Sequence, residues 1–326
     1  MQRRTFTGAA CAVCAASVLP DLVYAQAGYP TKPVKFIVPY APGGLPDTVA
    51  RVVAVRLGER LGQGVFIDNR SGGNGMVAYQ ALLQSNPGDG HTFIVSDGSM
   101  LSITPLINKA ANYRLGKEIL PVSLIARSPL FLVAHPKTGV GNLQEFIALV
   151  RSKPGQFTYG SSGIGSSHHL TMEALKAALN LDIRHVPYRG SGQSTPALIS
   201  GQVDFSIAAL PSIAGFVQSG QAKVLASNAG SRSAQAPDIP TIAEILPGFD
   251  FSVVVGVMAA STTPQAAIDR IGKEIAEVVK MPDVIKTFDA SVINPIGAGP
   301  LEYAKVIEHE NEVMGKAGKS ANLKPE

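Results

Sequence analysis

The hydrophobic positions of this chain fall into short apolar runs that alternate with longer segments of helical spacing. Residues Val34–Val38 (VKFIV) form an apolar run that predicts a buried strand. In residues 46–61, by contrast, Val49, Val53 and Leu57 recur every three to four positions, which predicts a helix. The alternation continues to the C-terminus. Strands that are apolar throughout and are separated by helices are typical of sheets covered on both faces, so we expect an α/β fold with mostly parallel sheets flanked by helices.

The remaining apolar runs predict further strands, and the remaining periodic segments predict further helices. The expected strands span residues 65–68, 91–96, 157–160, 183–188, 203–210, 223–228 and 249–260, and the expected helices span residues 76–84, 142–151, 167–179, 264–279, 282–289 and 300–314.

Two long apolar passages mark the expected domain boundaries. Residues 122–134 are interrupted only by a polar and proline pair at Ser128 and Pro129, and residues 251–260 form the second passage. We expect the chain to cross from one α/β lobe to another at the first passage and to return at the second, leaving a cleft between the lobes. The expected division is a discontinuous domain 1 of residues 28–125 plus 250–326 and a domain 2 of residues 126–249.

The first 25 residues have the three-part layout of a secretory signal. Arg3 and Arg4 precede an apolar run over residues 8–19, and small residues follow around Ala25. The run is too short to span a bilayer as a helix. The string RRTF favours twin-arginine export, and general secretory export remains an alternative. We therefore expect residues 1–25 to be removed and the mature chain to work in the periplasm.

Cysteine usage and charge exclude several classes of protein. Cys11 and Cys14 are the only cysteines, and both lie in the signal, so we expect no disulfide in the mature chain. The net charge is +4, with no basic run interleaved with aromatic residues, so we expect no nucleic-acid partner. No later segment has 18 consecutive apolar residues, and we expect a soluble monomer.

Three loops rich in glycine and serine each join an expected strand to an expected helix. They are PYAPGGLPD (residues 39–47), SDGSM (residues 96–100) and YGSSGIGSSHHL (residues 159–170). In open α/β sheets, ligands bind beyond the carboxyl ends of the strands, where helix N-termini point. Glycines allow close backbone approach, while hydroxyls and free amides at a helix start bind an anion without a lysine. The loops therefore predict a site for a small carboxylate.

Several candidate residues have a structural interpretation beside the functional one. Asp47 follows a Gly/Pro loop and could simply cap a helix. His168 and His169 could be ordinary helix residues, one solvated and one packed. Arg189 could be a surface residue, and Asp204 is as suited to bracing a neighbouring loop as to touching ligand. The candidate ligand-binding residues are Tyr40, Ala41, Pro42, Gly43, Gly44, Leu45, Asp47, Gly98, Ser99, Ser161, Ser162, Gly165, Ser166, Ser167, His168, Arg189 and Asp204.

Catalysis and cofactor binding have weaker support in the sequence. Ser161 and Ser162 lie outside any G-x-S-x-G turn, and neighbouring histidines do not make a triad without a third group. The string GNGMVA, with glycines at Gly73 and Gly75, fits G-x-G-x-x-A, but four residues separate it from the strand end. No phosphate loop and no metal-ligand spacing are present. We expect no catalytic activity, cofactor or metal; an exported hydrolase or nicotinamide-dependent enzyme remains the alternative.

The chain contains, in order, KFIVPYAPGGLPDTVAR, VFIDNRSGGNGMVAYQALLQSNPGDGHTFIV, YGSSGIGSSHHLTMEALK, IRHVPYRGSGQSTPALISGQVDFSI and GFDFSVVVGVMA. This series resembles the periplasmic receptors of tripartite tricarboxylate transporters, the Bug family of solute-binding proteins. The likeness runs from about Tyr29 to the C-terminal helix. It implies a two-lobed, type II-like periplasmic binding protein, or Venus flytrap, that closes on a small carboxylate and delivers it to membrane permease subunits. A ligand sensor that signals to a partner is an alternative.

The resemblance also implies which loops hold the ligand, partly through bridging waters. These are residues 40–47 and 161–168, with the loops at residues 98–99 and 188–190 completing the wall. Two departures from the family pattern bear on the ligand. Leu45 and Pro46 follow the paired glycines, which narrows that side of the site, and Ala208 and Ala209 replace an Asp-Asn pair, which argues against a ligand with an ammonium group. We therefore expect a carboxylate with an apolar or aromatic body.

Overall fold

The computed structural model describes residues 28–109, 111, 113–320 and 323, and the predicted signal at residues 1–25 lies outside them. The strands in this part of the chain are β1 (Val34–Val38), β2 (Val65–Asn69), β3 (Thr92–Asp97), β4 (Ile119–Ser128), β5 (Phe131–Ala134), β6 (Thr158–Ser161), β7 (Arg184–Pro187), β8 (Phe205–Ala208), β9 (Lys223–Ser227), β10 (Val253–Ala260) and β11 (Asn294–Ala298).

The α-helices of the same residues are α1 (Leu45–Leu61), α2 (Met76–Gln84), α3 (Ser99–Ser102), α4 (Thr104–Ile107), α5 (Leu143–Ser152), α6 (Ser167–Leu179), α7 (Ser191–Ile199), α8 (Leu210–Gln218), α9 (Gln265–Val278), α10 (Pro282–Asp289) and α11 (Pro300–Ser320). Short 3-10 helices are η1 (Gly73–Gly75), η2 (Pro87–Asp89), η3 (Pro136–Thr138) and η4 (Ile242–Glu244).

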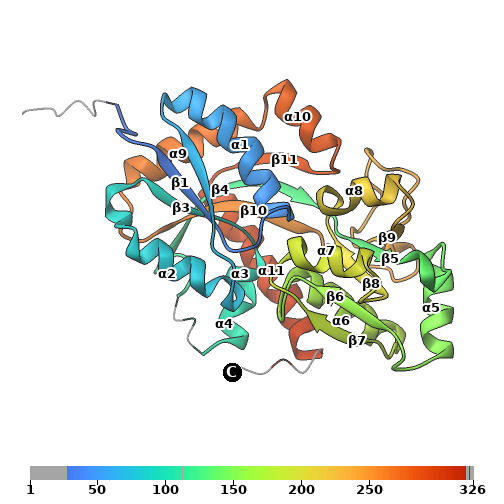
Figure 1. The fold of residues 1–326 in the computed structure, drawn as a ribbon. Coiled ribbons are helices and arrows are strands. Elements are labelled where there is room, and N and C mark those ends of the chain that lie inside the picture. The colour runs from blue at the N-terminus through green and yellow to red at the C-terminus, as the bar shows by residue number, and fades with distance from the viewer. Residues whose placement is uncertain (1–27, 110, 112, 321–322, 324–326) are drawn as a thin grey trace, which may run out of the picture.

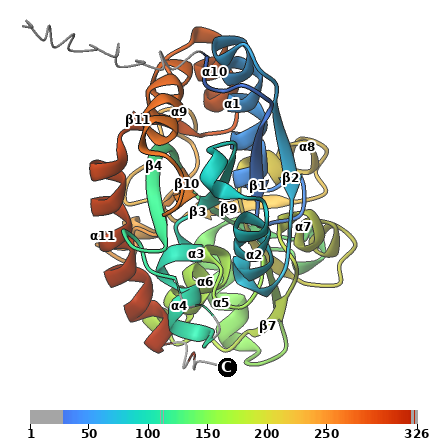
Figure 2. The same cartoon turned by 90° about the vertical axis from the view of Figure 1, so that its left-hand side faces the viewer.

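The described strands form two sheets that lie side by side (Figure 1). A six-stranded sheet has the order β11-β4-β10-β3-β1-β2, and a five-stranded sheet has the order β7-β6-β8-β5-β9. We call the first sheet with α1–α4 and α9–α11 the first lobe, and the second sheet with α5–α8 the second lobe. Helix α11 runs along one side of the molecule (Figure 2) and packs against β4, α3 and α6, so it contacts both lobes.

Both sheets are mixed, which corrects the expectation of mostly parallel sheets. In the first sheet β1 pairs in parallel with β2 and β3, but β10 is antiparallel to β3 and β4, and β11 is antiparallel to β4. In the second sheet β6 is parallel to β7 and β8, while β5 is antiparallel to β8 and β9. An apolar run indicates that a strand is buried on both faces. It does not indicate whether the neighbouring strand is parallel or antiparallel, because both kinds of strand can be buried in this way.

The chain crosses between the lobes at two adjacent places. Strand β4 ends at Ser128 in the first sheet and β5 begins at Phe131 in the second, so the polar and proline pair lies where one strand gives way to the next. The return runs from β9 to β10. Asn228 joins the two crossings, because its side chain accepts a hydrogen bond from the Leu130 amide at 2.8 Å and donates one to the Phe251 carbonyl at 2.6 Å. The domain limits at residues 125 and 250 stay a prediction.

The largest hydrophobic cluster runs through both lobes. It includes buried aromatic side chains from the first sheet, Phe36 and Phe93, and from the second lobe, Phe146 and Phe205. Several elements differ from the sequence prediction. The short helices α3 and α4 were not predicted, nor was β11, whose sequence NPIGA is neither apolar nor alternating, and α11 extends to residue 320. No helix of the described residues is long and apolar enough to cross a membrane.

Candidate functional site

The first of the three Gly/Ser-rich loops meets the second lobe directly. Glycines on both sides make this approach close: a Cβ added at Gly190, whose φ is 105°, would lie 3.1 Å from the Ala41 nitrogen. One added at Gly192 would lie 2.5 Å from the Pro42 carbonyl oxygen. A Cβ added at Gly44 would lie 3.8 Å from the side chain of Ser191 in α7. The β1–α1 loop and the start of α7 therefore form part of the interface between the lobes.

A buried carboxylate lies at the first-lobe side of this interface. Asp97, the last residue of β3, is 2% exposed, and its Oδ1 accepts hydrogen bonds from the Tyr40 hydroxyl and the Ser99 hydroxyl, both at 2.7 Å. From the second lobe, the Ser167 hydroxyl approaches Asp97 Oδ2 at 3.5 Å, which is a long contact. The hydroxyl hydrogens of Tyr40 and Ser99 are thus committed to Asp97, which the sequence analysis had not included among the site residues.

A second buried carboxyl group lies behind Asp97. Glu310 of α11 is 8% exposed, and a Cβ at Gly98 would overlap its carboxylate, so only glycine fits there. Burial, assisted by the charge of Asp97, raises the pKa of Glu310 to about 8. Burial also raises the pKa of Asp97, although the hydroxyls of Ser99 and Tyr40 oppose that change. At neutral pH the negative charge therefore resides mainly on Asp97, because it has donors around it and Glu310 Oε2 has none among the described residues.

Asp47 fixes the β1–α1 loop. Its Oδ2 accepts a hydrogen bond from the Gly43 amide at 2.9 Å, and its Oδ1 accepts one from the Asn69 side chain at 2.9 Å. Arg51 forms an ion pair with the same carboxylate at 2.9 Å. Burial works against ionisation here, but these partners together lower the pKa of Asp47. Asp47 therefore anchors the loop, and Leu45 beside it is buried in the main hydrophobic cluster.

The Gly/Ser loop of the second lobe divides its serines between structure and interface. Ser166 is the N-cap of α6: its hydroxyl accepts from the His169 amide at 3.3 Å and donates to the Gly163 carbonyl at 2.8 Å. Ser162 lies 3.2 Å from Ser191, measured between the two hydroxyl oxygens. The Ser191 hydroxyl in turn lies 3.3 Å from Nε2 of His168. Ser191 therefore joins Ser162 to His168 and lies near Gly44 of the first lobe, while Ser167 approaches Asp97 of that lobe; we call these four residues the group of neutral donors.

His168 is buried and has an unused ring nitrogen. Only 5% of the residue is exposed, and burial lowers the pKa of its imidazole to about 4, so the ring is neutral at physiological pH. Nδ1 has no hydrogen-bond partner among the described residues. An unpaired buried polar atom costs roughly 1–3 kcal/mol, so a ligand or water that bonds to it would be stabilising.

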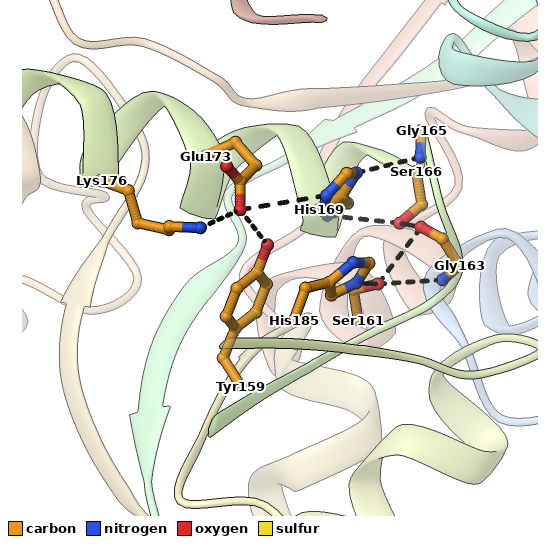
Figure 3. Close-up of polar contacts among 9 residues, drawn as sticks. All are labelled: Tyr159, Ser161, Gly163, Gly165, Ser166, His169, Glu173, Lys176 and His185. Atoms are coloured by element: carbon orange, nitrogen blue, oxygen red, sulfur yellow. Dashed lines mark hydrogen bonds and ion pairs between the residues drawn. The ribbon is translucent and has the colours of Figure 1, made fainter. Parts of the chain in front are cut away.

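The Ser161 side chain lies beside a group of stacked rings (Figure 3). Its Oγ lies 2.6 Å from Nε2 of His185, whose ring stacks against both Tyr159 and His169. The two imidazole centroids are 4.0 Å apart with an interplanar angle of 13°. Burial lowers the pKa of His185 to about 3 and that of His169 to about 4. His168 and His169 are both buried, so neither is the solvated helix residue that the structural interpretation allowed.

The structure places Asp204 at the opposite end of the second sheet. Asp204 precedes β8, and its Oδ2 accepts from the backbone amide and the hydroxyl of Thr158, at 2.8 Å and 3.0 Å, where β6 begins. Lys137 forms an ion pair with it at 3.1 Å. Because β6 and β8 are parallel, their first residues lie far from the loop that follows β6. Asp204 braces the sheet and is not brought together with the other candidate residues.

An open pocket of about 850 Å³ lies between the lobes beside these loops. The first lobe contributes Asn74 and Ile107, and the second contributes Ile164, Tyr188 and Arg189. The Asn74 side-chain amide donates a hydrogen bond to the Ile164 carbonyl at 2.5 Å, which joins the two walls. Among the described residues, no group of three His, Cys, Asp or Glu side chains could hold a metal ion.

Sequence reasoning missed three residues of this arrangement, namely Asn74, Asp97 and Ser191. Asp97 lies in the SDGSM loop, but only Gly98 and Ser99 of that loop were among the candidates. The Gly-Ser-Gly string at Gly190–Gly192 resembles the other Gly/Ser loops, and that was the available signal for Ser191.

Comparisons with known proteins agree with this architecture. A family model described as "Tripartite tricarboxylate transporter family receptor" matches residues 49–323. The chain is 30% identical, over 313 residues, to a protein encoded in the tcbD-tcbE intergenic region of Pseudomonas sp. strain P51, covering 95% of this chain and 92% of that protein. It is 32% identical over 274 residues to BugT of Bordetella pertussis, covering 83% and 84%.

Two solved structures are similar throughout. R. palustris Rpa4515, solved with adipate, has a TM-score of 0.87 and 30% identity, over 91% of this chain and all of that one. MatC of Rhodopseudomonas palustris, solved with bound malate, has a TM-score of 0.81 and 28% identity, over 89% and 99%. These neighbours confirm the two-lobed α/β fold of periplasmic binding proteins. With a family model that matches most of its length, this chain belongs to the tripartite tricarboxylate transporter receptor family.

Proposed function

We propose that this chain is a periplasmic receptor that captures a small carboxylate between its lobes and delivers it to a tripartite tricarboxylate-type membrane permease. The observation that carries the proposal is the group of neutral donors at the start of α6 and α7, which faces the first lobe. Ser162, Ser167, Ser191 and His168 supply hydroxyl and imidazole hydrogens there, together with the helix N-termini. The adipate and malate of the two similar structures are carboxylates, which supports the same ligand class.

The second lobe is the main anchor for the carboxylate in this proposal. On the first-lobe side, Tyr40 and Ser99 donate to Asp97, so their hydrogens are not available to an anion. Asp97 itself would repel a carboxylate that came into contact with it. Ser167 has only its long contact to Asp97, so its hydroxyl can turn toward a ligand. Contacts with both lobes would favour the closed form and make binding and lobe closure one event.

The enzyme alternative has one specific contact in its favour, the one between Ser161 and His185. A serine nucleophile also needs access to substrate and a third group that orients its base. Ser161 is fully buried, and no carboxylate of the described residues is bonded to His185, whose ring stacks against Tyr159 and His169. We therefore propose binding without chemical change to the ligand.

A panel of mono- and dicarboxylates, aliphatic and aromatic, tests the proposal by thermal unfolding and calorimetry. At a free concentration of about 100 times Kd, a ligand that binds only the folded state stabilises it by about 2.7 kcal/mol. At least one member of the panel should raise the melting temperature in this way. A panel in which no carboxylate does so would refute the ligand class. Ester hydrolysis that disappears in Ser161→Ala would establish the enzyme alternative.

A further inference from the structure

Two buried carboxyl groups lie behind the group of neutral donors. Asp97 ends β3, and Glu310 lies on α11, which packs against both lobes. Gly98 allows them to approach each other, because a Cβ at this position would overlap the Glu310 carboxylate. Asp97 is 2% exposed and Glu310 is 8% exposed, so water solvates neither of them well. They form one acidic pair, in which the charge of Asp97 acts on Glu310.

The atoms around the pair leave it short of hydrogen-bond partners. Glu310 Oε2 has no partner within the described chain, and neither has the hydroxyl of Tyr303, a fully buried residue of the same helix. Burial, together with the charges of Glu310 and Asp97, raises the pKa of Tyr303, so this hydroxyl keeps its hydrogen. A neutral carboxylic acid tolerates an unpaired buried oxygen better than a carboxylate does, because desolvation of a charge costs more. The pair is therefore suited to hold a proton.

Nearby side chains do not offset two negative charges on the pair. From β4, Arg127 lowers the pKa of Glu310, but burial and the charge of Asp97 outweigh it. His309 is exposed next to Glu310 on α11. Asp250 borders the same cavity of about 60 Å³ as Glu310 and adds a negative charge to this region. The surroundings therefore favour one ionised carboxyl group over two.

The elements that pack against the pair bring no further positive charge to it. Helix α3 and strand β10 have no titratable side chain. Helix α6 brings His168 to the interface, and burial keeps its imidazole neutral, with a pKa of about 4. Tyr40 and Ser99 each donate a hydrogen bond to Asp97 at 2.7 Å, which stabilises the charge of Asp97 without neutralising it.

A carboxylate bound to the group of neutral donors would come close to this pair. Ser167 belongs to that group, and its hydroxyl approaches Asp97 Oδ2 at 3.5 Å. An anion that accepts the Ser167 hydrogen therefore lies next to the Asp97 charge. If Glu310 were ionised as well, three negative charges would meet in a buried region, where like charges repel far more strongly than in water. A proton on the pair removes one of these charges.

We infer that Asp97 and Glu310 bind a proton together with the ligand, so that the receptor takes up a carboxylate and a proton as one event. The proton comes from solvent and resides mainly on Glu310, because Asp97 has the hydroxyl donors, and no bond of the ligand changes. This inference rests on the proposed function and describes how that site accommodates an anion beside an acidic pair.

The direction of the pH effect follows from the free protein. Burial and the charge of Asp97 raise the pKa of Glu310 to about 8, so the free pair loses its proton as the pH rises through this value. A bound carboxylate raises the proton affinity of the pair further, so the complex keeps its proton to a higher pH. Above about pH 8, binding is therefore accompanied by proton uptake, and Kd increases with pH.

Calorimetry in buffers of different ionisation enthalpy counts the protons that are taken up on binding. The probe is the member of the carboxylate panel that binds wild type most tightly, for example hexanoate, succinate, adipate or benzoate, all of which are fully ionised above about pH 7. We expect wild type to take up ~0.5–1 proton per ligand at pH 9 and much less at pH 7, while Kd rises by up to ~10-fold between pH 8 and pH 9.

Two variants assign the proton to the pair. Glu310→Gln is neutral at every pH, so it should take up no proton and show a constant Kd over this range. Glu312→Gln is the matched control, because Glu312 is exposed on the same helix, and it should behave as wild type. The unliganded melting temperature at each pH shows that each protein is folded.

Several results would overturn the inference while leaving the receptor function intact. These are binding by wild type without proton uptake at pH 9, retention of the uptake in Glu310→Gln, or its loss in Glu312→Gln. Uptake that grows toward acidic pH would also overturn it, because the proton would then reside on His168, whose pKa is about 4. Failure of wild type to bind every acid of the panel would instead refute the proposed function itself.

Discussion

Replacement of Gly192 by alanine should separate lobe closure from folding stability. Gly192 is the second residue of α7, and its φ is not in the positive region that excludes side chains. Alanine is favoured over glycine in helices by about 0.5–1 kcal/mol, so the second lobe itself should become slightly more stable. Across the interface, however, the new methyl would lie 2.5 Å from the Pro42 carbonyl oxygen.

The size of this obstruction follows from the geometry. Ordinary contacts of a Cβ begin near 3.4 Å, and the obstacle is backbone of the opposite lobe, so the lobes must part by about 1 Å at this point. Overpacking of this kind costs about 1–3 kcal/mol. In the free protein the lobes can separate to avoid the contact, but a ligand that needs both lobes cannot. We therefore expect a 5- to 150-fold weaker Kd for the best ligand of the panel.

Calorimetry gives the Kd, and urea unfolding without ligand gives the stability. The matched control is Gly215→Ala in α8, where an added Cβ meets nothing within 4 Å. It should raise stability by a similar amount and leave the Kd unchanged. Wild-type affinity in Gly192→Ala would refute the reasoning, because the contact between Gly192 and Pro42 would then be absent from the bound form.

Three further predictions address individual side chains. Ser162→Ala and Ser167→Ala should each weaken ligand binding by about 1–3 kcal/mol in calorimetry, with exposed Ser152→Ala as control, and unchanged affinity in both variants would remove this loop from the site. Asp204→Ala should lower the free energy of unfolding in urea by about 1–3 kcal/mol, because the Thr158 amide loses its partner, and should leave the Kd unchanged; a weakened Kd would place Asp204 in the site after all. Glu310 has a folded pKa of about 8 against 4.5 for the free side chain, so its contribution to stability is complete below pH 4.5 and is lost as the pH rises to about 8. Glu310→Gln should remove a decline of up to ~1.4 kcal/mol per pH unit over this window, and parallel pH profiles of wild type and variant would contradict the assignment.

Some of the site was predictable because local sequence determines it. The helix at Ser167–Leu179 begins where the pattern predicted, since Ser166 caps it with its own side chain. The Gly/Ser loops could be recognised as strand-to-helix connections for the same reason: glycine and serine there satisfy the backbone of residues close in sequence. The family, too, could be recognised from the order of these stretches.

The partners of these loops depend on contacts that no local pattern encodes. Asp97 meets Glu310 from a helix more than 200 residues later, and this neighbour decides which of the two carries the charge. The sequence suggested the Tyr40 and Ser99 residues as ligand contacts. In the structure their hydroxyls donate to Asp97 instead, because β1 and β3 pair side by side in the sheet.

The sequence alone therefore determined most of the longer elements, the chemistry of the loops and the family, because burial periodicity and capping act over a few residues. Only the tertiary structure decided the directions of the strands, the use of Asp204 as a brace, and the placing of Glu310 behind Asp97. Each of these depends on which distant segments pack together. A hydrophobic pattern predicts that one face of an element is buried, but it does not identify the segment that packs against that face.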